Sequence, residues 1–260
     1  MLLPAPCRIC GAMLANAGRI PICEACFALI APIAEPMCQC CGRPFEVAPQ
    51  AHSSPGLCRL CRTHFYAFDR ARSFAHYNDA LAGAIVLLKY EEVTRLGSWF
   101  AERLANLVRS AGDDFRADVV VPVPLHPDRR RERGYNQAEL IARPLAKNLG
   151  LDLGAYLLVR TKPRPAQLVL SRSEHWKSVR GAYATRPGVR VDKLRILLVD
   201  DVLTTGATLD ACSRELKRAG AASIMGLTVA RVVLGSSFTA SKQGTKTQVP
   251  RNQQGSASIS

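Results

Sequence analysis

The chain has 260 residues, of which 48% are hydrophobic and 22% are charged; this ordinary globular composition excludes wholesale disorder and collagen-like repeats. No apolar stretch approaches the roughly 20 residues of a transmembrane helix, and the start MLLPAPCRIC lacks the basic and apolar parts of a secretory signal. We therefore expect a cytoplasmic protein with no membrane insertion. The net charge is +14, and residues 161–234 carry 13 basic against 6 acidic side chains, which fits either a polyanionic partner or a solubilising surface.

Composition divides the chain into three regions. Residues 1–66 are rich in Cys and Pro and lack periodic apolar runs, whereas residues 67–234 alternate between strand-like and helix-like patterns. Residues 235–260 are polar, poor in aromatic residues and free of acidic ones. A segment of that kind cannot bury a core, so we expect a disordered tail.

Nine of the ten cysteines lie between residues 7 and 61, and eight of them form C-x-x-C pairs. The pairs are Cys7 with Cys10, Cys23 with Cys26, Cys38 with Cys41, and Cys58 with Cys61. Two such knuckles complete a tetrahedral four-sulfur zinc site, and a region with so little apolar periodicity needs metal to fold. The sequence thus predicts two structural zinc sites. Sequential pairing of the knuckles is the simplest assignment and a crossed pairing stays open; a redox dithiol is the weaker alternative.

The middle region has the following predicted elements in chain order. Extended chain is predicted for residues 68–77, helices for 79–90 and 96–108, a buried strand for 118–123, a helix for 136–149 with a kink at Pro144, a strand for 195–200, a helix for 208–218 and a strand for 223–230. This alternation of strands and helices predicts a parallel sheet joined by helical crossovers.

The segment ILLVDDVLTTGAT, residues 196–208, has the clearest chemical signature. A buried strand ends in Asp200 and Asp201, and a short loop of Thr and Gly opens into a helix. Helix starts offer free N–H groups to a phosphate, and hydroxyl groups add donors. Carboxylates suit ribose hydroxyls and Mg²⁺ instead. An N-capped helix after a buried strand is the alternative without function.

That segment resembles the phosphoribosyl pyrophosphate loop of type I phosphoribosyltransferases. In order, the cysteine knuckles, LLKY (87–90), VPVPLH (121–126), RRRERGYNQAELIA (129–142) and DDVLTTGAT make the chain similar to the ComF family, which is related to proteins of bacterial DNA uptake. The resemblance covers roughly residues 5–234. It implies an α/β fold: a type I phosphoribosyltransferase-like parallel sheet with helices on both faces at 67–234, preceded by a small Cys-rich double zinc ribbon at 1–66.

The resemblance also implies roles for single residues. Asp200 and Asp201 would hold the ribose diol and Mg²⁺ as catalytic groups. The residues that would bind the phosphoribosyl pyrophosphate are Thr204, Thr205, Gly206 and Thr208 at the 5-phosphate, Val123 and Pro124 at the pyrophosphate loop, Arg129 and Arg133 as clamps, and Lys89 as a further anion contact. A solvated charge run is the alternative for the two arginines, and an ordinary surface role is the alternative for Lys89.

Residues 160–190 correspond to the mobile loop and hood of such enzymes and combine basic with aromatic side chains. Arg172, Lys177, Arg180 and Trp176 are the candidate contacts to single-stranded DNA, because cations follow phosphates and rings stack on bases. The same segment could instead close as a lid over pyrophosphate.

Three functions remain open. The first is a DNA-uptake protein of natural competence that binds phosphoribosyl pyrophosphate with Mg²⁺ and single-stranded DNA, alongside competence-machinery proteins. The second is a genuine phosphoribosyltransferase that acts on a base or an amine. The third is a zinc-scaffolded adaptor with a non-catalytic nucleotide site.

Overall fold

A computed structural model describes residues 5–14, 19–45, 56–163 and 171–233. The predicted tail at 235–260 lies outside these residues. Within the described ranges, no helix combines the length and the apolarity that a membrane crossing requires.

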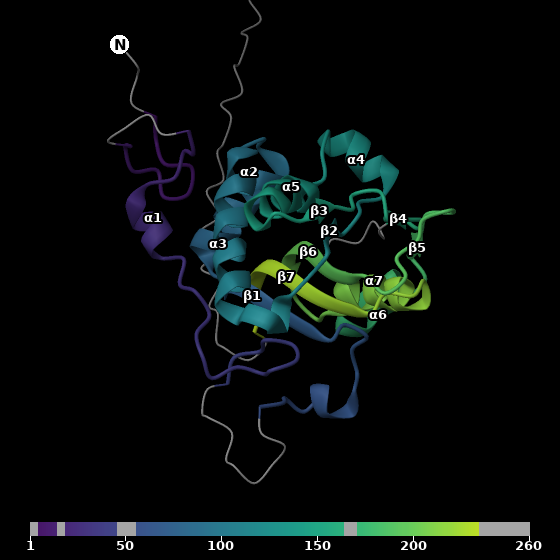
Figure 1. Ribbon diagram of the computed structural model, residues 1–260. Coiled ribbons are helices and arrows are strands. Elements are labelled where there is room, and N and C mark those ends of the chain that lie inside the picture. The colour runs from purple at the N-terminus through teal and green to yellow at the C-terminus, as the bar shows by residue number, and fades with distance from the viewer. Residues whose placement is uncertain (1–4, 15–18, 46–55, 164–170, 234–260) are drawn as a thin grey trace, which may run out of the picture.

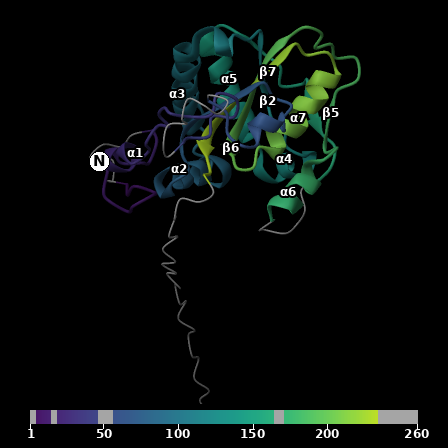
Figure 2. The same ribbon diagram turned by 90° about the horizontal axis from the view of Figure 1, so that it is seen from below.

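The N-terminal region contains little regular structure. Its elements are the helix α1 (Glu24–Ala28) and the 3₁₀ helix η1 (Cys61–Thr63), together with isolated bridges that close two cysteine loops, Pro6 with Met13 and Met37 with Pro44. Cysteines make up much of its buried apolar surface. Figures 1 and 2 show the purple segment that carries α1 beside helices α2 and α3.

A five-stranded sheet forms the centre of the rest of the chain. Its order is β1 (Arg70–His76), β7 (Ser223–Arg231), β6 (Arg195–Leu203), β2 (Val119–Pro122) and β3 (Asp152–Leu153), and every pairing is parallel. The long central strands β6 and β7 are buried along nearly their whole length. Continuous apolar runs such as RILLV at the start of β6 are typical of a parallel sheet covered on both faces.

Helices cover both faces of this sheet. On one face lie α2 (Asp79–Tyr90), α3 (Arg95–Ala111, followed by the 3₁₀ helix η2, Gly112–Phe115) and α5 (Gln137–Leu149), and on the other lies α7 (Ala207–Arg218) (Figure 1). Side chains of β6 alternate between the faces: Leu197 joins the first cluster and Leu198 the second. The predicted fold class, a parallel sheet with helices on both faces behind a Cys-rich module, is confirmed.

Two helices lie where the sequence analysis predicted no helix. Helix α4 (Pro127–Arg133) spans the arginine run; Pro127 opens it, the His126 side chain caps it, and Gly134 ends it with a positive φ of 80°. Helix α6 (Arg172–Val179) begins with a capping box of Ser171 and Glu174. Neither helix has an apolar period, which explains why periodicity did not predict them. Beside α6, β4 (Leu158–Arg160) pairs antiparallel with β5 (Tyr183–Thr185).

One strand differs from its predicted bounds in a way that affects the site. Strand β6 continues beyond residue 200 to Leu203, because its pairing with β7 extends to Arg231. The two aspartates therefore lie inside the strand rather than at its end. Helix α5 agrees with its predicted bounds to within one residue, since it includes Pro144 and ends at Leu149. Because Pro144 has no N–H, it cannot donate a hydrogen bond to the carbonyl of Leu140. That carbonyl oxygen packs against Gly97 of α3, where an added Cβ would lie only 2.5 Å from it.

Candidate functional site

A cavity of about 510 Å³ opens at the carboxyl ends of β2 and β6. Parallel sheets bind ligands at this edge, where the loops that follow neighbouring strands converge. The cavity is lined by nine of the residues predicted to form the site: Lys89, Val123, Pro124, Arg129, Arg133, Asp200, Asp201, Thr204 and Thr208. Segments that lie up to 119 positions apart in the sequence, as Lys89 and Thr208 do, thus contribute to one concave surface.

Asp200 and Asp201 are both buried and both line the cavity. The Oδ1 atom of Asp200 accepts a hydrogen bond of 2.9 Å from the backbone N–H of Asp201. Burial, together with the neighbouring Asp201 carboxylate, raises the pKa of Asp200 well above its usual range. Two adjacent carboxyl groups held in this way provide oxygen ligands for a divalent cation or acceptors for hydroxyl groups.

Lys89, in the last turn of α2, forms an ion pair with Asp201. Burial opposes the charged form of the lysine, but the carboxylates of Asp201 and Asp200 outweigh that effect, so the pKa of Lys89 is raised. The sequence predicted an anion contact for this residue. The structure places its ammonium group in an ion pair with Asp201, where it offsets the charge of that carboxylate.

The loop between β6 and α7 contributes its four predicted residues in different ways. Thr204 and Thr208 line the cavity, whereas the Thr205 hydroxyl lies 3.1 Å from Nδ1 of His175 and accepts from the N–H of Ala207. Gly206 has a φ of 83°, and a Cβ there would lie 2.6 Å from the ring of Tyr66. We expected Gly206 to let a phosphate approach the backbone. The structure adds a second reason for glycine, which is the close packing of Tyr66.

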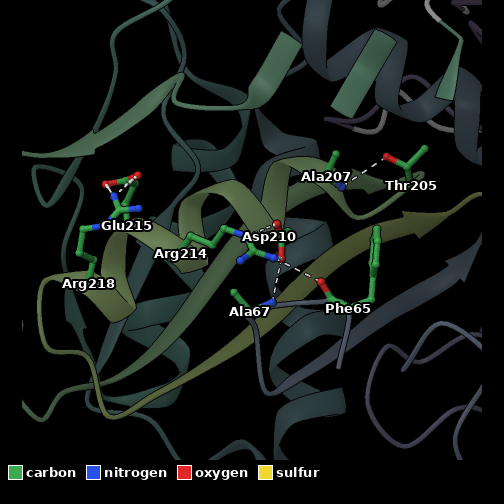
Figure 3. A network of polar contacts seen from close by, with 8 residues as sticks. All are labelled: Phe65, Ala67, Thr205, Ala207, Asp210, Arg214, Glu215 and Arg218. Atoms are coloured by element: carbon green, nitrogen blue, oxygen red, sulfur yellow. Dashed lines mark hydrogen bonds and ion pairs between the residues drawn. The ribbon is translucent and has the colours of Figure 1, made fainter. Parts of the chain in front are cut away.

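Residues 65–67, which follow the second cysteine group, support this loop from behind. The Tyr66 hydroxyl donates to the carbonyl of Thr205 over 3.0 Å. Figure 3 shows the buried carboxylate of Asp210, on α7, accepting from the backbone N–H of Ala67 at 2.7 Å and from Arg214, which also donates to the carbonyl of Phe65. Sequence reasoning missed Tyr66, Asp210 and His175, because their roles depend on contacts between distant segments.

The arginines of helix α4 divide into those that line the cavity and those that do not. Arg129 and Arg133 lie one turn apart and both line the cavity; the guanidinium of Arg133 contacts Gln137 and lies 4.8 Å from the centre of the Tyr90 ring. Arg130 and Arg131 are not among the lining residues and pair with Glu139 and Asp128. The arginine run therefore divides between a face that lines the cavity and a face that lies outside it; the clamp role of Arg129 and Arg133 stays a prediction.

The cysteines form two groups that follow the sequential pairing. Cys7, Cys10, Cys23 and Cys26 form one, and Cys38, Cys41, Cys58 and Cys61 form the other, with all sulfurs of a group within 4.8 Å of one another. The distances between Sγ atoms of Cys7 and Cys26, Cys10 and Cys23, and Cys41 and Cys58 are 3.8, 3.6 and 3.8 Å. A tetrahedron with Zn–S bonds of about 2.3 Å has edges of about 3.8 Å, so both groups fit a structural zinc ion with four thiolate ligands.

The predicted contacts to nucleic acid lie on and beside α6. Arg172, Lys177 and Arg180 are exposed. Trp176 instead packs against Phe65 and Tyr66, with ring centroids 4.9 and 6.3 Å apart, and its indole nitrogen is buried with no hydrogen-bond partner among the described residues. This packing occupies part of the ring surface that stacking on a base would need.

Comparison with known proteins places these features in a family context. Residues 1–63 match the family model of the double zinc ribbon domain. The chain is 28% identical to Competence protein F of Haemophilus influenzae over 71% of this chain and 80% of that protein. It is 28% identical to the DNA utilization protein YhgH of Escherichia coli K12 over 86% of this chain and 96% of that protein. Competence protein ComFC of Bacillus subtilis is 27% identical over 81% of this chain and 84% of its own length. These relatives confirm the resemblance to the ComF family.

Two of the solved structures that match part of the chain are enzymes whose names refer to phosphoribosyl compounds. The purine phosphoribosyltransferase of Pyrococcus horikoshii matches 52% of this chain and 87% of its own, with a TM-score of 0.33 and 17% identity. The glutamine phosphoribosylpyrophosphate amidotransferase of Bacillus subtilis, complexed with ADP and GMP, matches 52% of this chain and 26% of its own, with a TM-score of 0.36 and 21% identity.

Proposed function

We propose that the cavity binds phosphoribosyl pyrophosphate together with Mg²⁺, and that the protein uses this site and a surface for single-stranded DNA in DNA uptake. The observation that carries the proposal is the distribution of charge around the cavity. The buried pair Asp200 and Asp201 lines the same cavity as Thr204 and Thr208. Two arginines of α4 line it as well, the exposed Arg129 and the half-buried Arg133. A ligand with a sugar diol between two phosphate groups needs both kinds of contact.

Each part of the ligand has a matching set of groups. The hydroxyls of Thr204 and Thr208, beside the start of α7, would hold the 5-phosphate. Asp200 and Asp201 would hold the ribose hydroxyls and the cation, whose charge offsets that of the pyrophosphate. Arg129 and Arg133 would clamp the pyrophosphate with guanidinium groups, which match phosphate oxygens in pairs.

Transfer of the phosphoribosyl group is the second candidate activity, and the same geometry favours it. The bond between the anomeric carbon and pyrophosphate breaks, and the electron pair leaves with the pyrophosphate. A nitrogen of a base or an amine forms the new bond and releases its proton to the pyrophosphate oxygens or to solvent. Cationic groups near the leaving oxygens stabilise the charge that develops there, so positioning and electrostatics can supply most of the catalysis. Arg129 and Arg133 are the residues we assign to this task.

The proposal for DNA rests on the surface beside the cavity and on the relatives. Arg172, Lys177 and Arg180 are exposed near the rim to which α6 contributes His175 and Ser178. The relatives carry the names of competence and DNA utilization proteins. The double zinc ribbon would then serve as a rigid support and as the contact to competence-machinery proteins. If the cavity binds no ligand, the protein is better described as a zinc-scaffolded adaptor.

Titration calorimetry with phosphoribosyl pyrophosphate and Mg²⁺ tests the proposal. We expect binding by the wild type and its loss in the double variant Asp200→Asn with Asp201→Asn, because the cation loses both carboxylates. The matched control is Asp113→Asn, an exposed carboxylate on η2 outside the cavity. Zinc content should stay unchanged in all three proteins, which shows that the ribbons remain folded.

The two alternatives have distinct signatures in the same experiment. Heat that continues as pyrophosphate is released, once a base or an amine is present, indicates a transferase. Binding without turnover indicates a regulatory nucleotide site. Binding that survives in the double variant contradicts the assignment of Asp200 and Asp201.

A further inference from the structure

A second hollow, of about 560 Å³, lies on the outer side of α4. Its walls come from the start of α3, from α4 and from α5, and we call it the α4–α5 groove. Its basic residues are Arg95, Arg130, Arg143 and Lys147, and Glu139 is its acidic residue. None of these side chains was assigned to a site above.

The groove keeps a positive charge after its internal ion pairs are counted. The carboxylate of Glu139 forms an ion pair with Arg130 at 3.2 Å and accepts a hydrogen bond from Arg143 at 2.7 Å, so two guanidinium groups share one negative charge. Arg95 and Lys147 are exposed and, within the described part of the chain, form no ion pair. Four cations against one carboxylate leave a net charge of +3 in the groove. Such a surface attracts a polyanion.

The groove and the cavity are neighbours along α4. Between them lies a smaller hollow of about 170 Å³, which shares Lys89, Tyr90, Arg129 and Arg133 with the cavity and shares Tyr135 with the groove. The three hollows thus form a series that crosses α4. The arginines of α4 serve both sides of it, because Arg129 and Arg133 face the cavity side while Arg130 faces the groove.

An aromatic ring lies where the cavity and the small hollow meet. Tyr90 is 64% exposed, and the guanidinium of Arg133 lies against its ring. An exposed ring next to a track of cations offers stacking to a base while the cations contact phosphates. Paired bases in a duplex do not present their faces to such a ring. The combination therefore favours a single strand over a double helix.

We propose that single-stranded nucleic acid lies along the α4–α5 groove and reaches the mouth of the cavity at Tyr90. This inference rests on the proposed function, because it gives a path to the strand that the protein is proposed to handle. It adds a surface distinct from Arg172, Lys177 and Arg180 beside α6. In this arrangement α4 separates the strand's phosphates in the groove from the phosphate groups in the cavity.

The salt dependence of oligonucleotide binding tests the groove. The probe is an oligothymidylate of about 16 nucleotides, within the site sizes that such surfaces occupy. In the triple variant Arg95→Gln, Arg143→Gln and Lys147→Gln, we expect weaker binding and a slope of log K against log salt that is smaller by about 2, because each lost phosphate contact on a single strand removes about 0.7. Tyr90→Ala should weaken binding without changing the slope.

The matched control removes three charges at the opposite end of the sheet. Arg190, Lys193 and Arg218 lie before β6 or at the end of α7 and are exposed; their replacement by Gln should leave the slope within about 0.7 of the wild-type value. Circular dichroism and zinc content report whether each variant is folded.

The outcomes separate this inference from the proposed function. A lower slope in the groove variant alone, or in both the groove variant and the variant Arg172→Gln, Lys177→Gln and Arg180→Gln, supports the inference. An unchanged slope in the groove variant, with a lower slope in the variant beside α6, overturns the groove and keeps the proposed DNA binding. If the wild type binds no oligothymidylate, the groove and the proposed DNA binding are both wrong. Binding of phosphoribosyl pyrophosphate is tested separately, by calorimetry.

Discussion

The two cysteine groups of the ribbon have the same internal geometry. In each, the first cysteine begins a loop that closes at a glycine with positive φ, Gly11 or Gly42, whose N–H bonds the carbonyl of Cys7 or Cys38 over 2.8 Å. In each, the first sulfur accepts a backbone N–H over 3.3 Å, from Cys23 in one case and from Cys58 in the other. The glycine turn is local and follows from the C-x-x-C spacing, whereas the bond to the first sulfur joins the two knuckles of each group across 16 or 20 positions.

The surroundings of the two groups differ sharply. In the first, Cys10 is exposed, and the module packs on α2 and α3 through apolar side chains such as Ile22 and Ile30. In the second, all four sulfurs are buried, and Arg231 at the end of β7 donates to the carbonyl of Cys41 over 2.6 Å. Leu203, the residue before the Thr204 loop, pairs in register with Arg231. The first cysteine group thus packs on helices α2 and α3, whereas the second contacts the end of β7, next to the strand that leads into the Thr204 loop.

The largest expected effect comes from removing one zinc site at a time. The pair Cys38→Ser with Cys41→Ser should lose one zinc per chain and weaken binding of phosphoribosyl pyrophosphate by about tenfold or more, because the segment behind the β6–α7 loop loses its support. The matched pair Cys7→Ser with Cys10→Ser should also lose one zinc and leave ligand affinity nearly unchanged. Metal analysis and calorimetry measure both quantities. Equal losses of affinity in the two pairs would contradict the comparison.

A smaller effect is expected from the arginine that joins the second group to the sheet. Arg231→Met keeps an apolar stem but removes the donors to the carbonyl and the sulfur of Cys41. Outer-sphere partners of metal ligands typically contribute about 10–100-fold to metal affinity, so zinc should transfer to a chelator more readily from the second site.

The control for Arg231 lies beside the first group. Arg8 forms an exposed ion pair with Glu91, and exposed pairs contribute only about 0–1 kcal/mol. Arg8→Met should therefore leave chelator competition at the first site close to that of the wild type. If Arg231→Met also retains wild-type zinc affinity at the second site, the buried guanidinium does not stabilise the thiolates.

The smallest effect concerns the hydroxyl of Tyr66. Tyr66→Phe leaves the ring packed beside Gly206 and removes only the hydrogen bond to the Thr205 carbonyl, so we expect the free energy of unfolding to fall by about 1 kcal/mol. Ser73→Ala removes another buried hydroxyl contact, to Thr228, outside the cavity lining. Both variants should lose similar stability in denaturant unfolding, but only Tyr66→Phe should weaken ligand binding. The same ligand affinity in both would show that Tyr66 stabilises the fold without positioning the loop.

Much of the architecture could be predicted from local patterns. The helix predicted at residues 79–90 coincides with α2, and the strand predicted at 223–230 differs from β7 by one residue. Both have a strong apolar pattern and a polar residue or glycine near an end. The helices α4 and α6 could not be predicted in this way, because RRRER and RSEHWKSV contain almost no apolar residues. Their helical state depends on end caps and on contacts with the rest of the fold.

Sequence alone determined the features of this protein that depend on neighbouring residues. Four C-x-x-C pairs specified two zinc sites, and the string from Ile196 to Thr208 specified a strand, an acidic pair and a helix start, because these properties are encoded within a few positions. Tertiary structure decided which cysteines group together, that Lys89 pairs with Asp201, and which arginines of α4 face the cavity. It also decided that Tyr66 supports Thr205 and that Arg231 supports Cys41, contacts that span 139 and 190 positions. No local pattern records such contacts, since each depends on where the folded sheet brings its two partners.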